Sequence, residues 1–249
     1  MRAIVLSAGQ GSRLLPLTID RPKCLLPVGS RSTLQWQVEA LSRAPEIDDI
    51  VVITGFKAQM VEEAIAAMHG IRPPVRTLFN PFFKVADNLA SCWMARDLMD
   101  EDILIINGDS LFEVSILKRI IDGARAPINL TINRKALFDS DDMKVTLDGD
   151  RVLAVGKTLM QHETNAESIG LVVIREEGRD LFREQVEASM REGWGVGAWY
   201  LQVIDRLAKD GHVGATDIGN LEWCEIDFPS DLEIASRLVQ RWERLRVVA

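Results

Sequence analysis

The chain is poor in the features that mark several classes of protein. Its three cysteines, Cys24, Cys92 and Cys224, lie far apart without CxxC spacing, so neither a disulfide framework nor a cysteine metal site is expected. No apolar run approaches the ~20 residues of a membrane span, and none near the start has the length of a signal-peptide core. We therefore expect reduced thiols, a cytoplasmic location and no membrane association.

An excess of positive charge is also missing. With a net charge of −8, the chain lacks the basic surplus of proteins that bind nucleic acids or anionic membranes in general. A local group of lysines and arginines can oppose this sign, so an anionic ligand is not excluded. The sequence has no tandem repeat, no low-complexity segment and no Pro/Gly/Ser-rich linker. Its 249 residues are enough for one α/β domain with a substantial core.

Apolar strands and amphipathic helices alternate from the first residues onward. Aliphatic and β-branched runs predict strands at 3–6, 49–55, 75–79, 102–107 and 129–133. Helical spacing predicts helices over 33–44, 57–69, 88–98 and 115–125. Ser32 or Thr33 can cap the first helix, with Gln35 near the capping-box position. Such alternation is typical of a parallel sheet with crossover helices.

The second half of the chain has a different pattern. Short apolar runs at 143–147, 151–156 and 168–174 predict mixed or antiparallel strands, and Asp148-Gly149-Asp150 is a hairpin signal. Helices are expected over 181–192, 199–210 and 229–246, the last capped by Ser230, with a connector at 213–221 and a short strand at 222–228. We predict a single-domain, Rossmann-like α/β fold. Its sheet is mixed but mainly parallel, is flanked by helices, and has a smaller antiparallel portion.

The opening strand runs directly into a loop of small residues, 7–12, followed by Arg13 and, ten residues later, Lys23. A glycine-bearing loop after a buried strand exposes backbone N–H groups, which suit phosphate oxygens, and the two cations would add to this. Taken alone, Gly9 and Gly11 fit a tight turn equally well. The loop also lacks the complete P-loop and dinucleotide-binding patterns.

The whole stretch from Leu6 to Leu25, LSAGQGSRLLPLTIDRPKCL, resembles the signature of the sugar-phosphate nucleotidyltransferase superfamily, LAAGxGTRLxPLTxxxPKxL. Ser7 replaces an alanine of this signature. The resemblance implies that Arg13 and Lys23 are catalytic and that a nucleoside triphosphate is bound by Leu6, Ala8, Gly9, Gly11, Ser12 and Arg13.

Two acidic segments extend this resemblance. Asp109, in Asn107-Gly108-Asp109, and Asp227, in Glu225-Ile226-Asp227, look like the family's two metal carboxylates. The resemblance implies that they hold Mg²⁺, a cation that prefers oxygen ligands. Each alone has an ordinary structural alternative, because Asp109 can form a turn and Asp227 can cap the last helix.

Shorter stretches resemble the phosphocholine and phosphonate cytidylyltransferase branch of the superfamily. They are Asn80 to Lys84 (NPFFK), Asp87 to Trp93 (DNLASCW), Asp141 to Lys144 (DDMK), Gly156-Lys157, and Glu167 to Gly170 (ESIG). The resemblance implies CTP as the nucleotide, with Asn88 and Ser91 in its site. The acceptor would be surrounded by Lys144, Lys157, Glu167, Gly170, Trp199 and Trp223.

Part of the acceptor assignment can be argued from the residue types themselves. Lys144 and Lys157, on neighbouring predicted strands, can bind an acceptor phosphate or can equally form a solvated hairpin face. The rings of Trp93, Trp199 and Trp223, with acids such as Glu167 or Glu225, can hold an ammonium group. Trp36 and Trp242 are expected in the core.

The expected activity is Mg²⁺-dependent transfer of CMP from CTP to a small phosphorylated amino alcohol or aminoalkyl phosphonate, with release of pyrophosphate. Residues 1–134 would form the nucleotide-binding half and 135–249 the acceptor-binding half. A phosphomonoester is mostly dianionic at neutral pH, so the reaction needs no base, and the three His and three Cys form no catalytic group. Two alternatives stay open: a sugar-1-phosphate nucleotidyltransferase and a non-catalytic nucleotide-sensing module. A homo-oligomer is compatible with the sequence.

Overall fold

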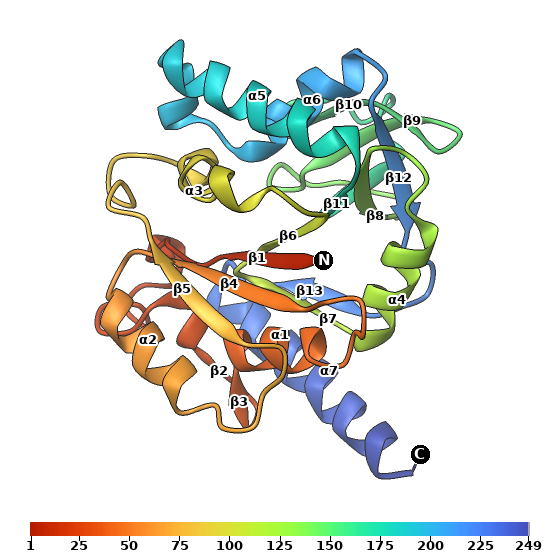
Figure 1. Ribbon diagram of the computed structural model, residues 1–249. Coiled ribbons are helices and arrows are strands. Elements are labelled where there is room, and N and C mark those ends of the chain that lie inside the picture. The colour runs from red at the N-terminus through yellow and green to blue at the C-terminus, as the bar shows by residue number, and fades with distance from the viewer. Residues whose placement is uncertain (249) are drawn as a thin grey trace.

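A nine-stranded sheet forms the centre of the computed structural model, which describes residues 1–248 (Figure 1). In spatial order its strands are β5 (Val75–Phe79), β4 (Asp49–Thr54), β1 (Arg2–Leu6), β6 (Ile103–Asn107), β11 (Ala166–Ile174), β8 (Ile128–Asn133), β12 (Val213–Asp217), β10 (Arg151–Gly156) and β9 (Lys144–Asp148). Strands β5, β4, β1 and β6 are mutually parallel. Strand β11 is antiparallel to β6 and β8, and β9 and β10 form an antiparallel hairpin. The predicted mixed α/β sheet with an antiparallel portion is confirmed.

Helices cover both faces of this sheet. They are α1 (Thr33–Leu41), α2 (Ala58–Ala66), α3 (Asn88–Met94), α4 (Val114–Gly123), α5 (Glu177–Arg191), α6 (Tyr200–Lys209) and α7 (Pro229–Val248). Successive side chains of a strand point to opposite faces, so Ile4 packs in the core with α3, α5 and α6, and Val5 packs with α1, α2 and α4. Figure 1 shows α3, α5 and α6 on one side of the sheet and α1 and α2 on the other. Burial on both faces explains why the central strands are almost continuous aliphatic runs.

Two small sheets lie beside the main one. Strand β13 (Trp223–Glu225) pairs antiparallel with β7 (Ser110–Phe112), and β2 (Pro27–Val28) pairs with β3 (Arg31–Ser32). Single turns of 3₁₀ helix occur at Ser12–Leu14, Lys23–Leu25, Arg96–Leu98 and Trp194–Gly197. Trp36 and Trp242 are buried together in a third core cluster, which joins α1 to α7. Among residues 1–248, none of the helices combines the length and the apolarity needed to cross a bilayer.

Helix boundaries follow the predicted signals at one end of α1 and differ at α7. Ser32 caps α1 in a complete capping box with Gln35, as expected. Helix α7 begins at Pro229, a residue suited to the first helical position, so Ser230 lies inside the first turn and is not the cap. The Asp231 carboxylate instead accepts hydrogen bonds from the backbone N–H groups of Asp227 and Phe228, at 2.9 and 2.7 Å.

The predicted connector at 213–221 was wrong in its first part. Residues Val213–Asp217 form β12, which lies parallel to β8 and brings Val213 opposite Ile128. Its sequence, Val-Gly-Ala-Thr-Asp, has few large apolar residues, so its strand conformation depends on pairing with neighbours rather than on local propensity.

Candidate active site

The loop after β1 and the turn after β6 meet at the carboxyl edge of the sheet. Leu6 and Asn107 are opposite each other in the parallel pairing, and the Gly108 N–H donates to the Leu6 carbonyl at 3.0 Å. A Cβ on Gly108 would lie 2.5 Å from that carbonyl oxygen and 2.6 Å from Ser7 Oγ. A glycine at 108 therefore lets the two loops touch, which places the phosphate-loop candidates beside Asp109.

Within the first loop, Gly9 and Gly11 have different roles. Gly11 has φ +76°, and a Cβ there would lie 2.8 Å from the Cβ of Lys23. Gly11 thus allows the Lys23 side chain to pass closely across the loop. Gly9 has open space around its Cβ position, on the side of the loop that lines a cavity.

Lys23 connects the two carboxylates that the sequence singles out. Its Nζ donates to Asp109 Oδ2 at 2.8 Å and to Asp227 Oδ1 at 2.5 Å. Burial by itself would lower the pKa of Lys23, but the two carboxylates outweigh it and raise the pKa above its usual value. Arg13 adds a second cation, since its Nη1 donates to Asp227 Oδ2 at 2.9 Å.

Three carboxylates form one group around this lysine. Pairing of β13 with β7 places Glu225 opposite Ser110, and Asp109, Glu225 and Asp227 each offer an oxygen within 4.8 Å of the others. Enclosure in the cavity wall and repulsion from the two aspartates raise the pKa of Glu225 to about 8. A cation bound here would favour the ionised form of Glu225.

The group fits a magnesium ion. All its donors are carboxylate oxygens, the ligands that this hard cation prefers. Asp109 Oδ1 is buried and has no hydrogen-bond partner within residues 1–248, so it is available as a ligand. In the protein without ligands, Lys23 occupies one oxygen of each aspartate.

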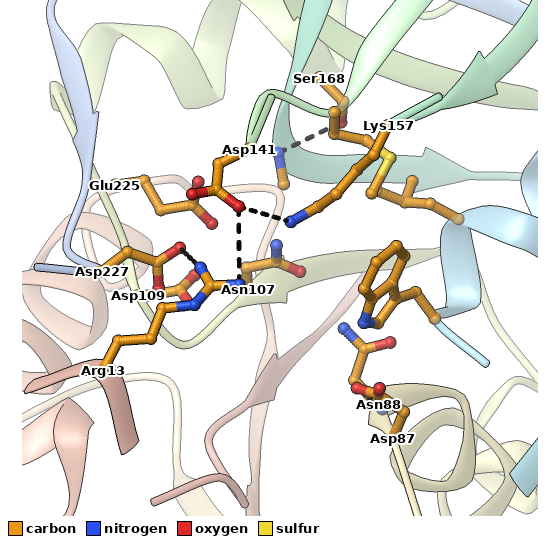
Figure 2. Close-up of a pocket in the computed structure, with 14 residues that line it drawn as sticks. Arg13, Asp87, Asn88, Asn107, Asp109, Asp141, Lys157, Ser168, Glu225 and Asp227 are labelled. Atoms are coloured by element: carbon orange, nitrogen blue, oxygen red, sulfur yellow. Dashed lines mark hydrogen bonds and ion pairs between the residues drawn. The ribbon is translucent and has the colours of Figure 1, made fainter. Parts of the chain in front are cut away.

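Two adjoining cavities open at this edge. The inner cavity, about 220 Å³, is lined by residues that include Gly9, Gly11 and Lys23. The central cavity, about 240 Å³, is lined by residues that include Lys157 and Trp199 (Figure 2). Both are lined by Asp87, Asn88, Asn107 and Asp109. A ligand in the inner cavity would therefore meet a ligand in the central cavity beside Asp109.

The central cavity carries both signs of charge. Lys157 Nζ lies 3.6 Å from Asp141 Oδ1 and 4.9 Å from the centre of the Trp199 ring. Arg13 approaches the same Asp141 carboxylate from the other side, at 3.7 Å. Figure 2 shows Asp141 between these two cations, with Glu225 next to it. The wall can thus receive an anionic group at the cations and a cationic group at the carboxylates.

Several predicted site residues lie away from these two cavities. Ser91 is buried behind the wall, where its hydroxyl accepts from Asn80 Nδ2 at 3.1 Å. Lys144 is buried, and its Nζ donates to the Lys157 carbonyl at 2.9 Å, so it supports the strand that precedes Lys157 instead of facing the acceptor space. Ala8 is buried, its carbonyl bonded to the Phe56 N–H.

The remaining predicted residues are divided between the cavities and the surface. Gly170 lines the central cavity, and Leu6 the inner one. Glu167 and Trp223 line an outer cavity of about 360 Å³, which shares Asp141 and Glu225 with the central cavity. The Glu167 carboxylate is bonded to Lys135 at 2.6 Å. Ser12 is exposed beside Arg13. Trp93 lies on a separate apolar pocket and donates to Glu187 at 2.6 Å.

Sequence reasoning did not select Asn107 or Asp141 as site residues, and it gave Glu225 only to ammonium binding. Asn107 lines both cavities, and its buried Oδ1 lacks a hydrogen-bond partner within the described part of the chain. A usable signal existed for Asn107 and Glu225, since each stands within two residues of a predicted metal carboxylate. Asp141 had only its place in the DDMK stretch.

A model of the nucleotidyl transferase family matches residues 2–144, more than half of the chain. The chain belongs to this family. The matched segment contains the loop after β1, Lys23 and Asp109, which are the parts of the site described above that derive from the first half of the chain.

Full-length comparisons give relatives with cytidylyl chemistry in their names. The chain is 29% identical over 241 residues, 93% of its length, to the CMP-5'-(3-aminopropyl)phosphonate synthase of Streptomyces rubellomurinus, and covers 37% of that protein. It is 23% identical to the bifunctional IPC transferase and DIPP synthase of Aquifex aeolicus, covering 94% of this chain and 51% of that protein. It is 25% identical to the CTP:phosphoglutamine cytidylyltransferase of Campylobacter jejuni, covering 94% of this chain and 98% of that enzyme. The chain therefore spans between about a third and about half of the first two relatives.

Solved structures share the fold. The inositol-1-phosphate CTP transferase from T. maritima superposes with a TM-score of 0.76 at 22% identity, covering 94% of each chain. The CTP:phosphocholine cytidylyltransferase from Streptococcus pneumoniae has the same TM-score at 19% identity, covering 96% of this chain and 98% of that one.

Proposed function

We propose that this chain is a Mg²⁺-dependent cytidylyltransferase that transfers CMP from CTP to a small phosphate or phosphonate acceptor bearing an amino group. Relatives named for transfer to aminopropylphosphonate, phosphoglutamine and phosphocholine support the nucleotide and the acceptor class. The observation that carries the proposal is the position of Lys23, between Asp109 and Asp227 at the boundary of two cavities. A boundary of this kind is required where an acceptor phosphate attacks a nucleotide phosphate.

The inner cavity suits the nucleotide phosphates. Backbone N–H groups around Gly9 and Gly11, with Arg13, would bind the β- and γ-phosphates, and Lys23 would bind the α-phosphate. Asp109 and Asp227, with Glu225 beside them, would hold Mg²⁺, which when bound neutralises charge on the phosphate oxygens.

The reaction needs positioning more than proton transfer. An acceptor oxygen forms a bond to the α-phosphorus while the bond from that phosphorus to the bridging oxygen breaks, and pyrophosphate leaves with the electron pair. The acceptor oxygen is already negative at neutral pH, so no side chain has to remove a proton. Lys23 and Arg13 would stabilise the charge that spreads over the transferring group.

The central cavity supports an acceptor with opposite charges at its two ends. Lys157 would bind the acceptor phosphate, and the Trp199 ring and the Asp141 and Glu225 carboxylates would bind the ammonium end. We propose that residues 1–134 supply most of the nucleotide site and 135–249 most of the acceptor site. A cytoplasmic location and a homo-oligomer remain predictions.

The test measures pyrophosphate release with each of the four NTPs and UTP's analogue dTTP against a panel of phosphocholine, aminoalkyl phosphonates, amine-free alkyl phosphonates and sugar 1-phosphates. We expect turnover with CTP and the amine-bearing acceptors. Turnover restricted to sugar 1-phosphates would contradict the acceptor assignment. No turnover with any pair would favour a nucleotide-sensing role.

A substitution in the central cavity tests the acceptor wall more sharply. Asp141→Asn keeps the side-chain shape and removes the charge. Since a hydrogen bond to a charged group contributes ~1.5–3 kcal/mol, KM for the amine-bearing acceptor should rise about tenfold. KM for CTP and for an amine-free acceptor of the same length should change by less than about twofold. An equal change for both acceptors would remove Asp141 from ammonium binding.

A further inference from the structure

Helix α1 sends one buried amide to the turn that carries Asp109. The side chain of Gln37 is 1% exposed, and its Nε2 donates to the Asn107 carbonyl and to the Ser110 carbonyl, both at 2.8 Å. These two carbonyls lie on either side of Gly108 and Asp109. A single side-chain amide thus holds both ends of the turn.

The rest of the turn is held through its own backbone. The Gly108 N–H donates to Leu6, and the Asp109 carbonyl accepts from the Ile226 N–H at 3.1 Å. Beyond its contact with Lys23, the Asp109 carboxylate has no other restraint at Oδ1 within residues 1–248. Its direction therefore depends on the conformation of the turn, and that conformation depends on Gln37.

The choice of residue at 37 supports the same conclusion. The neighbours of Gln37 on α1 are mostly apolar and buried, and an apolar side chain of the same length would fill this position. Burying an amide is unfavourable unless it is hydrogen-bonded, and here both donor protons are used. The two carbonyls would lose their partner if an apolar residue replaced Gln37.

We propose that Gln37 is a positioning residue for nucleotidyl transfer, which fixes the 107–110 turn so that Asp109 presents its carboxylate to the metal. This inference rests on the proposed function for its relevance to catalysis. A displacement of about 1 Å at a metal ligand is enough to weaken a preorganised site. The orphaned Oδ1 atoms of Asn107 and Asp109 would both move with the turn.

The test measures Mn²⁺ binding alone, by electron paramagnetic resonance, so it needs neither CTP nor an acceptor. Gln37→Met keeps the length of the side chain and removes both N–H donors. Its matched control is Thr33→Val, on the same helix, because Thr33 is equally buried and its Oγ1 has no hydrogen-bond partner within the described residues. We expect the Mn²⁺ dissociation constant to rise at least about fivefold in Q37M and to stay within twofold in T33V.

A merely structural role for Gln37 predicts a different pattern, in which Q37M melts at a lower temperature but binds Mn²⁺ like the wild type. Near-UV circular dichroism of the tryptophans establishes that each variant is folded. Gln37→Leu is a second probe, which also lacks both donors and fills the space differently should Q37M not fold. Wild-type Mn²⁺ affinity in either folded variant would overturn the proposal. Failure of the proposed cytidylyl transfer would leave this readout intact.

Discussion

Lys23 and a bound metal compete for the same oxygens, which makes the metal affinity of the free protein a sensitive measure of the site. Lys23 Nζ occupies Asp109 Oδ2 and Asp227 Oδ1 in the structure. A metal that binds these aspartates without nucleotide has to displace the ammonium group. We therefore expect Lys23→Met to bind Mn²⁺ more tightly than the wild type, although the same substitution should severely reduce turnover.

The size of the effect follows from the two contacts. Hydrogen bonds to charged groups contribute ~1.5–3 kcal/mol each, so two of them amount to about 3 kcal/mol at the lower limit. Hydration of the displaced ammonium group returns part of this. If about 1.4 kcal/mol of the competition remains, the Mn²⁺ affinity of K23M rises about tenfold.

The control has to separate this competition from a general change in charge. Lys157→Met removes one positive charge from the same cavity, but Lys157 lies 3.6 Å from Asp141 and against the Trp199 ring rather than between the metal carboxylates. We expect less than about threefold tighter Mn²⁺ binding in K157M. Titration of the three proteins with Mn²⁺, followed by electron paramagnetic resonance at fixed ionic strength, gives both numbers. Equal tightening in K23M and K157M would refute the competition, and so would weaker binding in K23M.

Other substitutions separate stability from ligand binding. Gly11→Ala forces a positive-φ position and a contact with Lys23, so it should destabilise the protein by ~1–2 kcal/mol, and Tm should fall by roughly 2–4 °C per kcal/mol in thermal unfolding. Gly9→Ala meets open space, so its Tm should be unchanged or slightly raised while CTP affinity, measured by calorimetry, falls; a large loss of Tm in G9A would contradict this. Asp109→Asn removes one ligand charge and one Lys23 contact, so the Mg²⁺ activation curve should shift to higher concentration or activity should disappear; an unchanged curve would remove Asp109 from the metal site.

The first half of the site could be predicted because its residues are contiguous in sequence. The signature from Leu6 to Leu25 contains both the loop and Lys23, and the strand that ends at Asn107 places Asp109 at the same sheet edge by a general rule for parallel strands. Gln37 could not be found in this way. Its function depends on which carbonyls lie opposite one position of α1, and helical periodicity assigns that position only to a buried face.

The acceptor half was harder to predict because strand pairing decides which face a side chain occupies. Lys144 and Glu167 are paired across β9 and β11 and are both buried, so neither reaches the central cavity. Lys157 comes directly after β10, beyond the last paired residue, and its side chain is directed to the cavity. A lysine near a predicted strand end is thus ambiguous until the register is known, since a shift of one residue exchanges the two faces.

The arrangement also explains how a chain with a net charge of −8 can take two anionic substrates. Each cation of the site already has a carboxylate partner: Lys23 has Asp109 and Asp227, while Arg13 and Lys157 both face Asp141. Substrate phosphates would not meet bare positive charge, and binding becomes an exchange of partners. The carboxylates released from Lys23 then need a new cation, and Mg²⁺ arriving with the nucleotide supplies it. Metal and nucleotide should therefore reinforce each other's binding, because either one alone leaves charges at this boundary without partners.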